Sequence, residues 1–144
     1  MDEKSVAPKV FFNASVILAG LRSPTGGSAK ILGWSRKGKI CGIVSEVVLD
    51  EVFRKYKKVG IKKPAISNLK VIFCKLLLSP KTPLIERFEK IALDFGDTHV
   101  LASSVEAKVD YLVSLDKKHI LSLKEIIKKP KIVSPGQLIE EVSQ

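Results

Sequence analysis

The sequence predicts an α/β domain whose helices cover both faces of a central, mostly parallel sheet of four or five strands. Two observations favour this fold. Short β-type apolar runs, at residues 9–12, 39–44, 111–113 and 131–133, alternate with segments of helical periodicity. The connections are short, as in right-handed βαβ units. No repeat or linker interrupts the 144 residues, so we expect one domain over 1–144 with its core at about 9–142.

Each helical segment is predicted from its apolar periodicity and its end signals. Gly38 is a typical stop and Ser45 a typical N-cap, whereas Pro64 marks a break. The predicted helices cover 14–19, 28–37, 46–58, 65–78, 84–93, a segment opened by Asp97, 117–121 and 137–142. Within the segment opened by Asp97, residues 100, 101 and 104 share one helix face with the carboxylate.

Several classes of protein are disfavoured. The apolar runs are too short to span a bilayer and no secretory h-region follows Met1, so a soluble, cytoplasmic protein without membrane contact is expected. Cys41 and Cys74 lack the spacing of metal ligands or of a redox motif. They are interpreted as two small buried hydrophobic residues in a reducing compartment.

The charge is unevenly distributed along the chain. The formal net charge is +10, from 25 basic and 15 acidic residues. Residues 4–45 hold seven basic residues and no acid, and residues 52–85 hold nine and no acid. A basic surface with a confined acidic site is typical of a protein that holds a polyanion around a cation. A solvated basic face that only aids solubility is the alternative.

Four oxygen-bearing residues are predicted to lie at or just beyond strand ends, or on the helices that follow them: Asn13, Glu51, Asp97 and Asp116. Because ligands of parallel sheets gather at the carboxyl ends of the strands, these side chains are expected at one edge. Carboxylate and amide oxygens suit hard divalent ions, which promote phosphodiester hydrolysis. Taken singly, Asp97 and Asp116 also suit helix caps, and Glu51 suits an ordinary surface position.

The ordered set KVFFNASVILAGL, SPTGGSAKIL, SEVVLDEV, DTHVLASSVEAKVDYLVSLDKKHIL and IVSPGQLI resembles a PIN domain, close to the toxins of VapC-type toxin–antitoxin pairs. The resemblance implies a three-layer α/β/α fold and a Mg²⁺- or Mn²⁺-dependent ribonuclease acting on single-stranded RNA. It places Glu51, Asp97 and Asp116 at acidic metal-site positions and Ser114 at a small hydroxyl position. Ser15 stands at a position that is polar in the family.

The sequence departs from this family at the first acidic position, where Asn13 stands in place of the family's aspartate. An amide keeps an oxygen donor but lacks the negative charge. The leading hypothesis is therefore a PIN-type endoribonuclease, a toxin of a toxin–antitoxin pair, whose activity is reduced or lost through Asn13. The resemblance also implies a homodimer and a cognate antitoxin protein, for which the apolar segment 65–78 could provide a groove, a dimer contact or simply core.

Two other functions compete with this one. The first is a non-catalytic RNA- or protein-binding module. It predicts salt-sensitive RNA binding, independent of metal, through a basic segment that comprises Arg54, Lys55, Lys57, Lys58, Lys62 and Lys63. The second is metal-free cleavage by His99 and His119 as a general acid/base pair, although both are more simply interpreted as surface histidines.

Overall fold

A computed structural model describes residues 6–91 and 95–143. Its centre is a five-stranded sheet in the order β3-β2-β1-β4-β5, and every neighbouring pair is parallel. The strands are β1 (Lys9–Phe12), β2 (Cys41–Ser45), β3 (Lys75–Leu77), β4 (Tyr111–Val113) and β5 (Lys131–Val133). The predicted α/β class and parallel sheet are confirmed.

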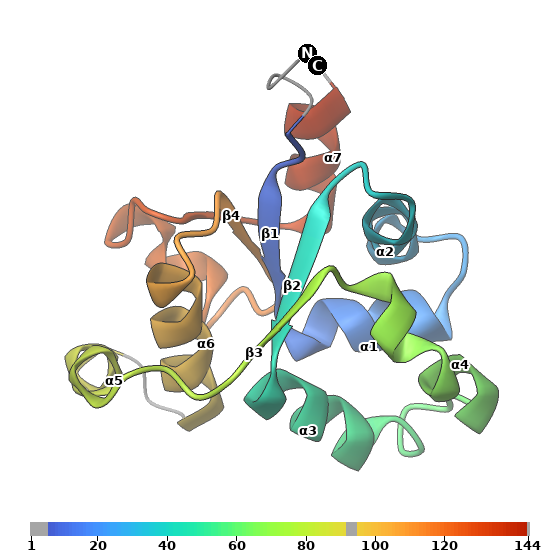
Figure 1. The fold of residues 1–144 in the computed structure, drawn as a ribbon, viewed down its shortest axis with the longest axis horizontal. Helices are drawn as coiled ribbons and strands as arrows, with labels where there is room; N and C mark the ends of the chain where they lie inside the picture. Colours follow the sequence, from blue (N-terminus) through green and yellow to red (C-terminus); the bar gives the residue numbers. More distant parts are fainter. Residues whose placement is uncertain (1–5, 92–94, 144) are drawn as a thin grey trace.

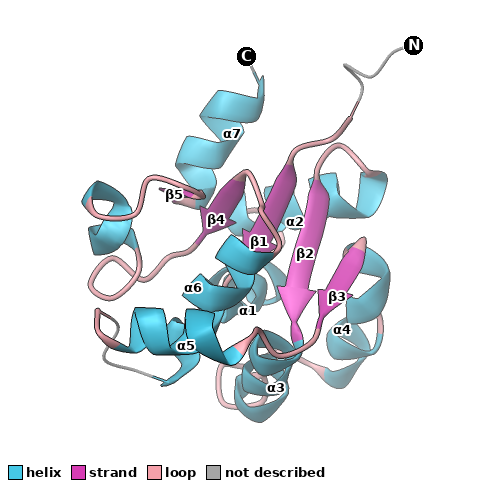
Figure 2. Cartoon of the chain, turned by 60° about the vertical axis from the view of Figure 1, so that its left-hand side comes forward, coloured by secondary structure: helices cyan, strands magenta, loops and turns pink. Residues whose placement is uncertain are grey.

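Helices cover both faces of this sheet, which makes the fold three-layered. The α-helices are α1 (Ala14–Arg22), α2 (Gly27–Lys37), α3 (Glu46–Lys55), α4 (Lys63–Ser67), α5 (Thr82–Glu89), α6 (Phe95–Glu106) and α7 (Pro135–Ser143). Helices α1, α2 and α7 pack on one face and α5 and α6 on the other (Figures 1 and 2). Helix α3 contacts both α1 and α6 at the carboxyl end of β2 (Figure 1). No helix among the described residues is long and apolar enough to cross a bilayer.

The central strand β1 anchors the core. Its side chains from Val10 to Phe12 are fully buried, as are Leu112 and Val113 of the neighbouring β4. Such continuous apolar runs are typical of parallel strands, which are covered by helices on both faces. The register pairs Phe12 with Val113, so the two strands end side by side.

The predicted end signals around β2 act as expected. Gly38 ends α2 with a φ of 83°, a left-handed conformation that glycine adopts without a steric penalty. The Ser45 hydroxyl accepts a hydrogen bond from the Val48 amide at 3.3 Å and caps α3. The helix ends at Lys55, however, rather than at the predicted residue 58.

The prediction of a helix over 65–78 is wrong. The chain forms the short helix α4, then a 3₁₀-helix over Leu69–Ile72, and then the edge strand β3. Local apolar content suited a helix, but Ile43 to Ser45 of β2 pair with Lys75 to Leu77 and complete the sheet. Backbone pairing with a distant strand therefore overrides the local pattern.

The interpretation of the cysteines as two separate buried residues is also wrong. Cys41 and Cys74 form a disulfide with a Cα–Cα distance of 5.6 Å. The pairing of β2 with the segment at β3 brings them together, and the Cys74 amide donates to the Gly42 carbonyl at 2.9 Å. Their separation of 33 residues hides this proximity in the sequence.

Other element boundaries shift modestly. Helix α5 begins at Thr82 and ends at Glu89, so the predicted helix 84–93 starts late and extends too far; residues 92 and 93 lie outside the described residues. The predicted helix 117–121 is a turn in which the Asp116 carbonyl accepts from the amides of Ile120 and Leu121. A 3₁₀-helix follows at Leu121–Glu125.

A polar network ties α7 to the amino ends of β4 and β5. The Glu141 carboxylate accepts from the Tyr111 hydroxyl at 3.1 Å and pairs with the Lys131 ammonium at 2.7 Å. The bond from Lys131 lowers the pKa of Glu141 below its ordinary 4.5 and raises the pKa of Lys131. The pKa of Tyr111 is raised mainly by burial of its hydroxyl and, to a smaller extent, by the hydrogen bond to Glu141.

Glu141→Gln is expected to weaken the docking of α7 by a small amount, because the ion pair is partly exposed. Because the pKa of Glu141 is lower in the folded protein than in the unfolded chain, its ionised carboxylate stabilises the fold at any pH above the unfolded pKa. This stabilisation is lost as the pH falls through the folded pKa. The difference in unfolding midpoint between parent and variant should therefore be present at neutral pH and shrink below about pH 4. Thermal melts across pH measure it. Glu140→Gln, on the same helix and exposed, is the control; an equal response of the two variants would contradict the prediction.

Candidate functional site

The predicted site residues surround the carboxyl edge of the sheet. Asn13 directly follows β1, and Ser114 directly follows β4. The backbone amide of Asn13 donates to the Val113 carbonyl at 3.1 Å. Because β1 and β4 are neighbours, the loops that leave them lie together. Asn13 is 7% exposed and Ser114 is fully buried.

The Ser114 hydroxyl links the two loops. It accepts from the Asn13 side-chain Nδ2 at 2.8 Å and from the Asp116 backbone amide at 3.0 Å. Ser15 adds a second link, since its hydroxyl accepts from the Leu115 amide at 3.1 Å. The backbone that carries Asp116 is therefore held in place by polar contacts to the start of α1.

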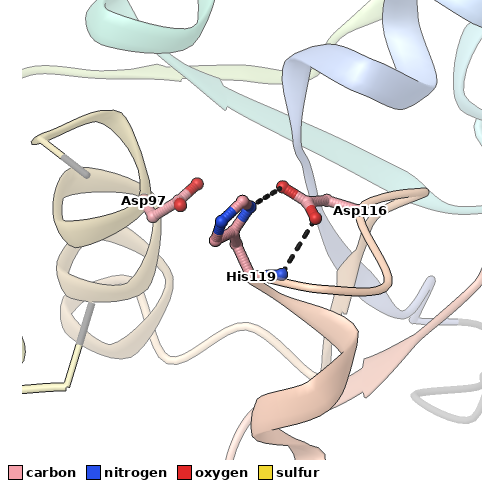
Figure 3. A group of neighbouring side chains, drawn as sticks. All are labelled: Asp97, Asp116 and His119. Carbon is pink, nitrogen blue, oxygen red and sulfur yellow. Dashed lines mark hydrogen bonds and ion pairs between the residues drawn. The ribbon is translucent and has the colours of Figure 1, made fainter. Parts of the chain in front are cut away.

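A cluster of three side chains forms the centre of the site. One ligand atom from each of Asp97, Asp116 and His119 lies within 4.8 Å of the others. Figure 3 shows the imidazole between the two carboxylates, with Asp97 contributed by α6 and the other two by the loop after β4. The Asp116 carboxylate accepts from the His119 backbone amide at 2.9 Å, and its second oxygen lies 3.2 Å from Nδ1.

His119, predicted from sequence to be a surface histidine among lysines, does lie at the surface, but it also belongs to this cluster. Its side chain is 40% exposed and faces the acids. The signal in the sequence was its spacing three residues after Asp116, at which an aspartate carboxylate commonly accepts the backbone amide. That turn directs the imidazole back over the carboxylate.

These donors suit a divalent metal ion. Two carboxylates and an imidazole converge, and each is partly exposed. Carboxylates are the ligands of Mg²⁺ and Mn²⁺, and imidazole also binds transition metals. Asp97 and Asp116 thus lie close together, as predicted from the sequence.

Glu51 lies nearby but outside this cluster. Its carboxylate pairs with the Lys55 ammonium at 2.8 Å, one turn along α3. It lines a cleft of about 620 Å³, together with Arg54 and Lys55 of α3 and with Phe95 and Gly96 at the start of α6. The cleft therefore adjoins the segment that carries Asp97, and its walls are formed by α3 and α6.

For His99, in contrast, the prediction of a surface position is wrong. It is 6% exposed, and its ring lies 4.2 Å from the ring of Phe95 at an interplanar angle of 43°. Its buried Nδ1 has no hydrogen-bond partner among the described residues. The pairing of His99 with His119 as a general acid and base gains no support from this packing.

The basic segment runs from the end of α3 to the start of α4, and all its cationic residues are exposed. Arg54 pairs with Asp50 at 3.2 Å, and Arg54 and Lys55 line the cleft. The basic charge thus begins at the cleft and continues away from it along the chain. Its members are Arg54, Lys55, Lys57, Lys58, Lys62 and Lys63.

Comparisons with known proteins identify the fold and the family. No curated protein sequence matches the chain. Among solved structures, the fold is similar to the crystal structure of PAE2754 from Pyrobaculum aerophilum, with a TM-score of 0.62 at 15% identity, covering 96% of this chain and 98% of that one. The model of the PIN domain matches residues 9–118, which include Asn13, Glu51, Asp97 and Asp116. The chain therefore belongs to the PIN-domain family.

Proposed function

We propose that this protein is a metal-dependent endoribonuclease that hydrolyses single-stranded RNA, with low activity in the present sequence. PIN domains are generally nucleases, which supports the reaction class. The observation that carries the proposal is the convergence of Asp97, Asp116 and His119 at the carboxyl edge of the sheet. The basic segment begins at the nearby cleft, with Arg54 and Lys55.

The roles of the residues follow from their positions. A bound divalent ion would supply an activated water and stabilise the charge that develops on the phosphate. Asp97 and Asp116 provide the anionic oxygens, and Ser114 fixes the backbone of Asp116. Glu51 stands at the cleft, where its carboxylate can orient a water molecule or the substrate. Arg54 and Lys55 attract the phosphates of the strand.

Asn13 accounts for the proposed low activity. Its Nδ2 donates to Ser114, so the side chain contributes a hydrogen bond at a position where the family has a carboxylate. The site has one negative charge fewer for a cation and for the positioning of water. RNA cleavage with Mg²⁺ or Mn²⁺, compared between this chain and Asn13→Asp, tests the function.

We also propose that Mn²⁺ binds more tightly than Mg²⁺, because the imidazole of His119 joins the carboxylates and suits transition metals better than Mg²⁺. Asp116→Asn should weaken Mn²⁺ binding by about 10- to 100-fold. His119→Gln should weaken Mn²⁺ binding and leave Mg²⁺ binding nearly unchanged. Titration calorimetry and Mn²⁺ electron paramagnetic resonance without RNA measure both.

Glu125→Gln is a suitable control for metal binding, because this exposed carboxylate pairs with Lys128 outside the cluster. Its Mn²⁺ affinity should equal that of the parent protein. Unchanged Mn²⁺ affinity in Asp116→Asn would contradict the proposed metal centre. Unchanged Mn²⁺ affinity in His119→Gln would contradict the role of the imidazole alone.

A second candidate function is a non-catalytic RNA-binding module. The hydrogen bond from the Asn13 side chain to the Ser114 hydroxyl favours it, because this contact engages the side chain within the protein. This function predicts salt-sensitive RNA binding that a chelator does not alter, together with absent cleavage even after Asn13→Asp. The two functions are therefore separated by the same cleavage assay.

For the biological setting, we propose a toxin that acts on RNA in the cytoplasm, forms a homodimer and is neutralised by a cognate antitoxin protein. Exposed apolar side chains near the sheet edge, at Val71, Leu76 and Leu78, support a protein contact there. Analytical ultracentrifugation measures the oligomeric state.

The cytoplasmic location is tested by thiol labelling of Cys41 and Cys74 in cell extracts. Disulfides are rare in the reducing cytosol, so free thiols at these two positions support a cytoplasmic protein.

A further inference from the structure

An aromatic ring in the cleft between α3 and α6 is left open to solvent. Phe95 is 72% exposed, although it is the first residue of α6 and stands two positions before Asp97. It lines the same cleft as Glu51, Arg54 and Lys55. Single exposed apolar residues are common, so the exposure alone indicates little. Its place in the cleft is what requires an explanation.

The Phe95 ring packs against the buried ring of His99. Phe95 contacts the ring of His99 at a centroid distance of 4.2 Å, and His99 itself is almost fully buried in the face of α6 that packs on the core. This contact orients the phenyl ring from one side. The large exposed fraction shows that much of the remaining ring surface is available for a ligand.

The surroundings of the ring select the kind of ligand. Apart from Phe95 and Gly96, the described residues that line the cleft come from α3: Glu46, Val47, Asp50, Glu51, Arg54 and Lys55. A protein-binding hot spot is usually embedded in a larger apolar patch, whereas this ring is surrounded mainly by charged side chains. Three of these charged residues are acids, and the other two, Arg54 and Lys55, begin the exposed basic segment that continues away from the cleft. A flat apolar ring near a basic segment matches a nucleobase attached to a phosphate backbone.

We propose that Phe95 is a stacking platform for one nucleobase of single-stranded RNA in the cleft between α3 and α6. This proposal rests on the proposed function and identifies how its substrate is held. A phenyl ring has no hydrogen-bonding group, so it recognises the face of a base rather than its edge. In a duplex that face is covered by the neighbouring bases, which makes the platform selective for single strands.

Base stacking predicts an order of affinity. Purines offer a larger face than pyrimidines, so an adenine oligonucleotide should bind more tightly than a uracil oligonucleotide of equal length. An oligonucleotide with abasic positions should bind most weakly. Phosphate contacts through Arg54 and Lys55 do not distinguish the three, because they are independent of the base.

The test measures binding of short fluorescein-labelled RNA by fluorescence anisotropy in a chelator, so that cleavage does not interfere. Phe95→Ala should lose about tenfold in affinity for base-bearing RNA and show no further loss on abasic RNA. Phe95→Trp should retain or improve binding. Phe53→Ala is the matched control, since Phe53 is a half-exposed phenylalanine of α3 that does not line the cleft.

Several results would overturn the platform. These are equal affinity of parent and Phe95→Ala, an equal loss on abasic RNA, or absence of RNA binding by the parent chain. Thermal melts of each variant identify a folding defect, and the Phe95→Trp variant supplies a second readout. Its added fluorescence, relative to the parent with buried Trp34, should be quenched by base-bearing RNA and unaffected by abasic RNA.

The test also separates this inference from the nuclease proposal. If Phe95→Ala loses base-dependent binding while Asn13→Asp never cleaves RNA, the platform stands and the nuclease proposal fails. If Asn13→Asp cleaves RNA while Phe95→Ala binds like the parent, the nuclease proposal stands and the platform is wrong. A selective loss of binding to a protein partner in Phe95→Ala, with RNA binding intact, would also overturn the platform.

Discussion

Asn13→Asp is expected to raise metal-dependent cleavage of single-stranded RNA by about 100-fold or more. The introduced carboxylate adds a negative charge beside the loop of Asp116, where a cation and the developing charge on phosphate must be held. Electrostatic groups of this kind contribute on the order of 10²- to 10³-fold to enzymatic rates. Cleavage of a fluorogenic RNA with Mn²⁺, followed over time, measures the change.

The fold should accept this substitution. Ser114 currently accepts from Asn13 Nδ2 and from the Asp116 amide. Its hydroxyl proton can rotate and donate to the introduced carboxylate while the bond from the Asp116 amide is kept. Because position 13 is buried, the added charge should lower the melting temperature without metal, and Mn²⁺ should restore it.

The sequence offers a matched control for the added charge. Asn68 is exposed at the end of α4, and Asn68→Asp makes the same chemical change away from the site. It should leave both RNA cleavage and Mn²⁺ binding unchanged. If Asn13→Asp neither cleaves RNA nor binds Mn²⁺ more tightly than the parent, the nuclease proposal is wrong.

Removal of the disulfide between Cys41 and Cys74 is expected to lower the free energy of unfolding by about 3–4 kcal/mol. The cross-link closes a loop with a sequence separation of 33 residues, and the chain-entropy model gives roughly this value for such a loop. The expected loss is a few hundredfold in the folding equilibrium, the largest stability change predicted for this protein.

Urea unfolding with and without reductant measures this loss. The Cys41→Ser, Cys74→Ser double variant should unfold at the same urea concentration as the reduced parent, and reductant should not change the variant further. Equal midpoints for the oxidised and reduced parent would contradict the prediction.

The edge strand β3 has only three residues and pairs with β2 alone, so its backbone amides should be the first to lose protection from hydrogen exchange when the disulfide is reduced.

The general architecture could be predicted from local patterns. Four of the five strands, and the helices that end at Gly38 or begin after Ser45, carry strong local signals. The rule that parallel strands present their ligands at the carboxyl edge was sufficient to place Asp97 and Asp116 together. In these regions the local preferences and the tertiary structure agree.

The features that the sequence did not reveal depend on contacts between distant segments. Strand β3 and the disulfide exist because residues 75–77 pair with β2. His99 is buried because of how α6 packs, and His119 joins Asp97 and Asp116 because a turn after Asp116 folds it back. Local preference amounts to less than about 1 kcal/mol per residue, so such pairing and packing can override it.

The sequence by itself therefore determined the α/β class, the central parallel strands and the two aspartates of the site, because periodicity, caps and strand ends are local properties. Only the tertiary structure decided that His119 joins those aspartates and that Phe95 opens onto the cleft with Glu51. These positions result from the packing of α3, α6 and the loop after β4, and no short segment of sequence contains that arrangement.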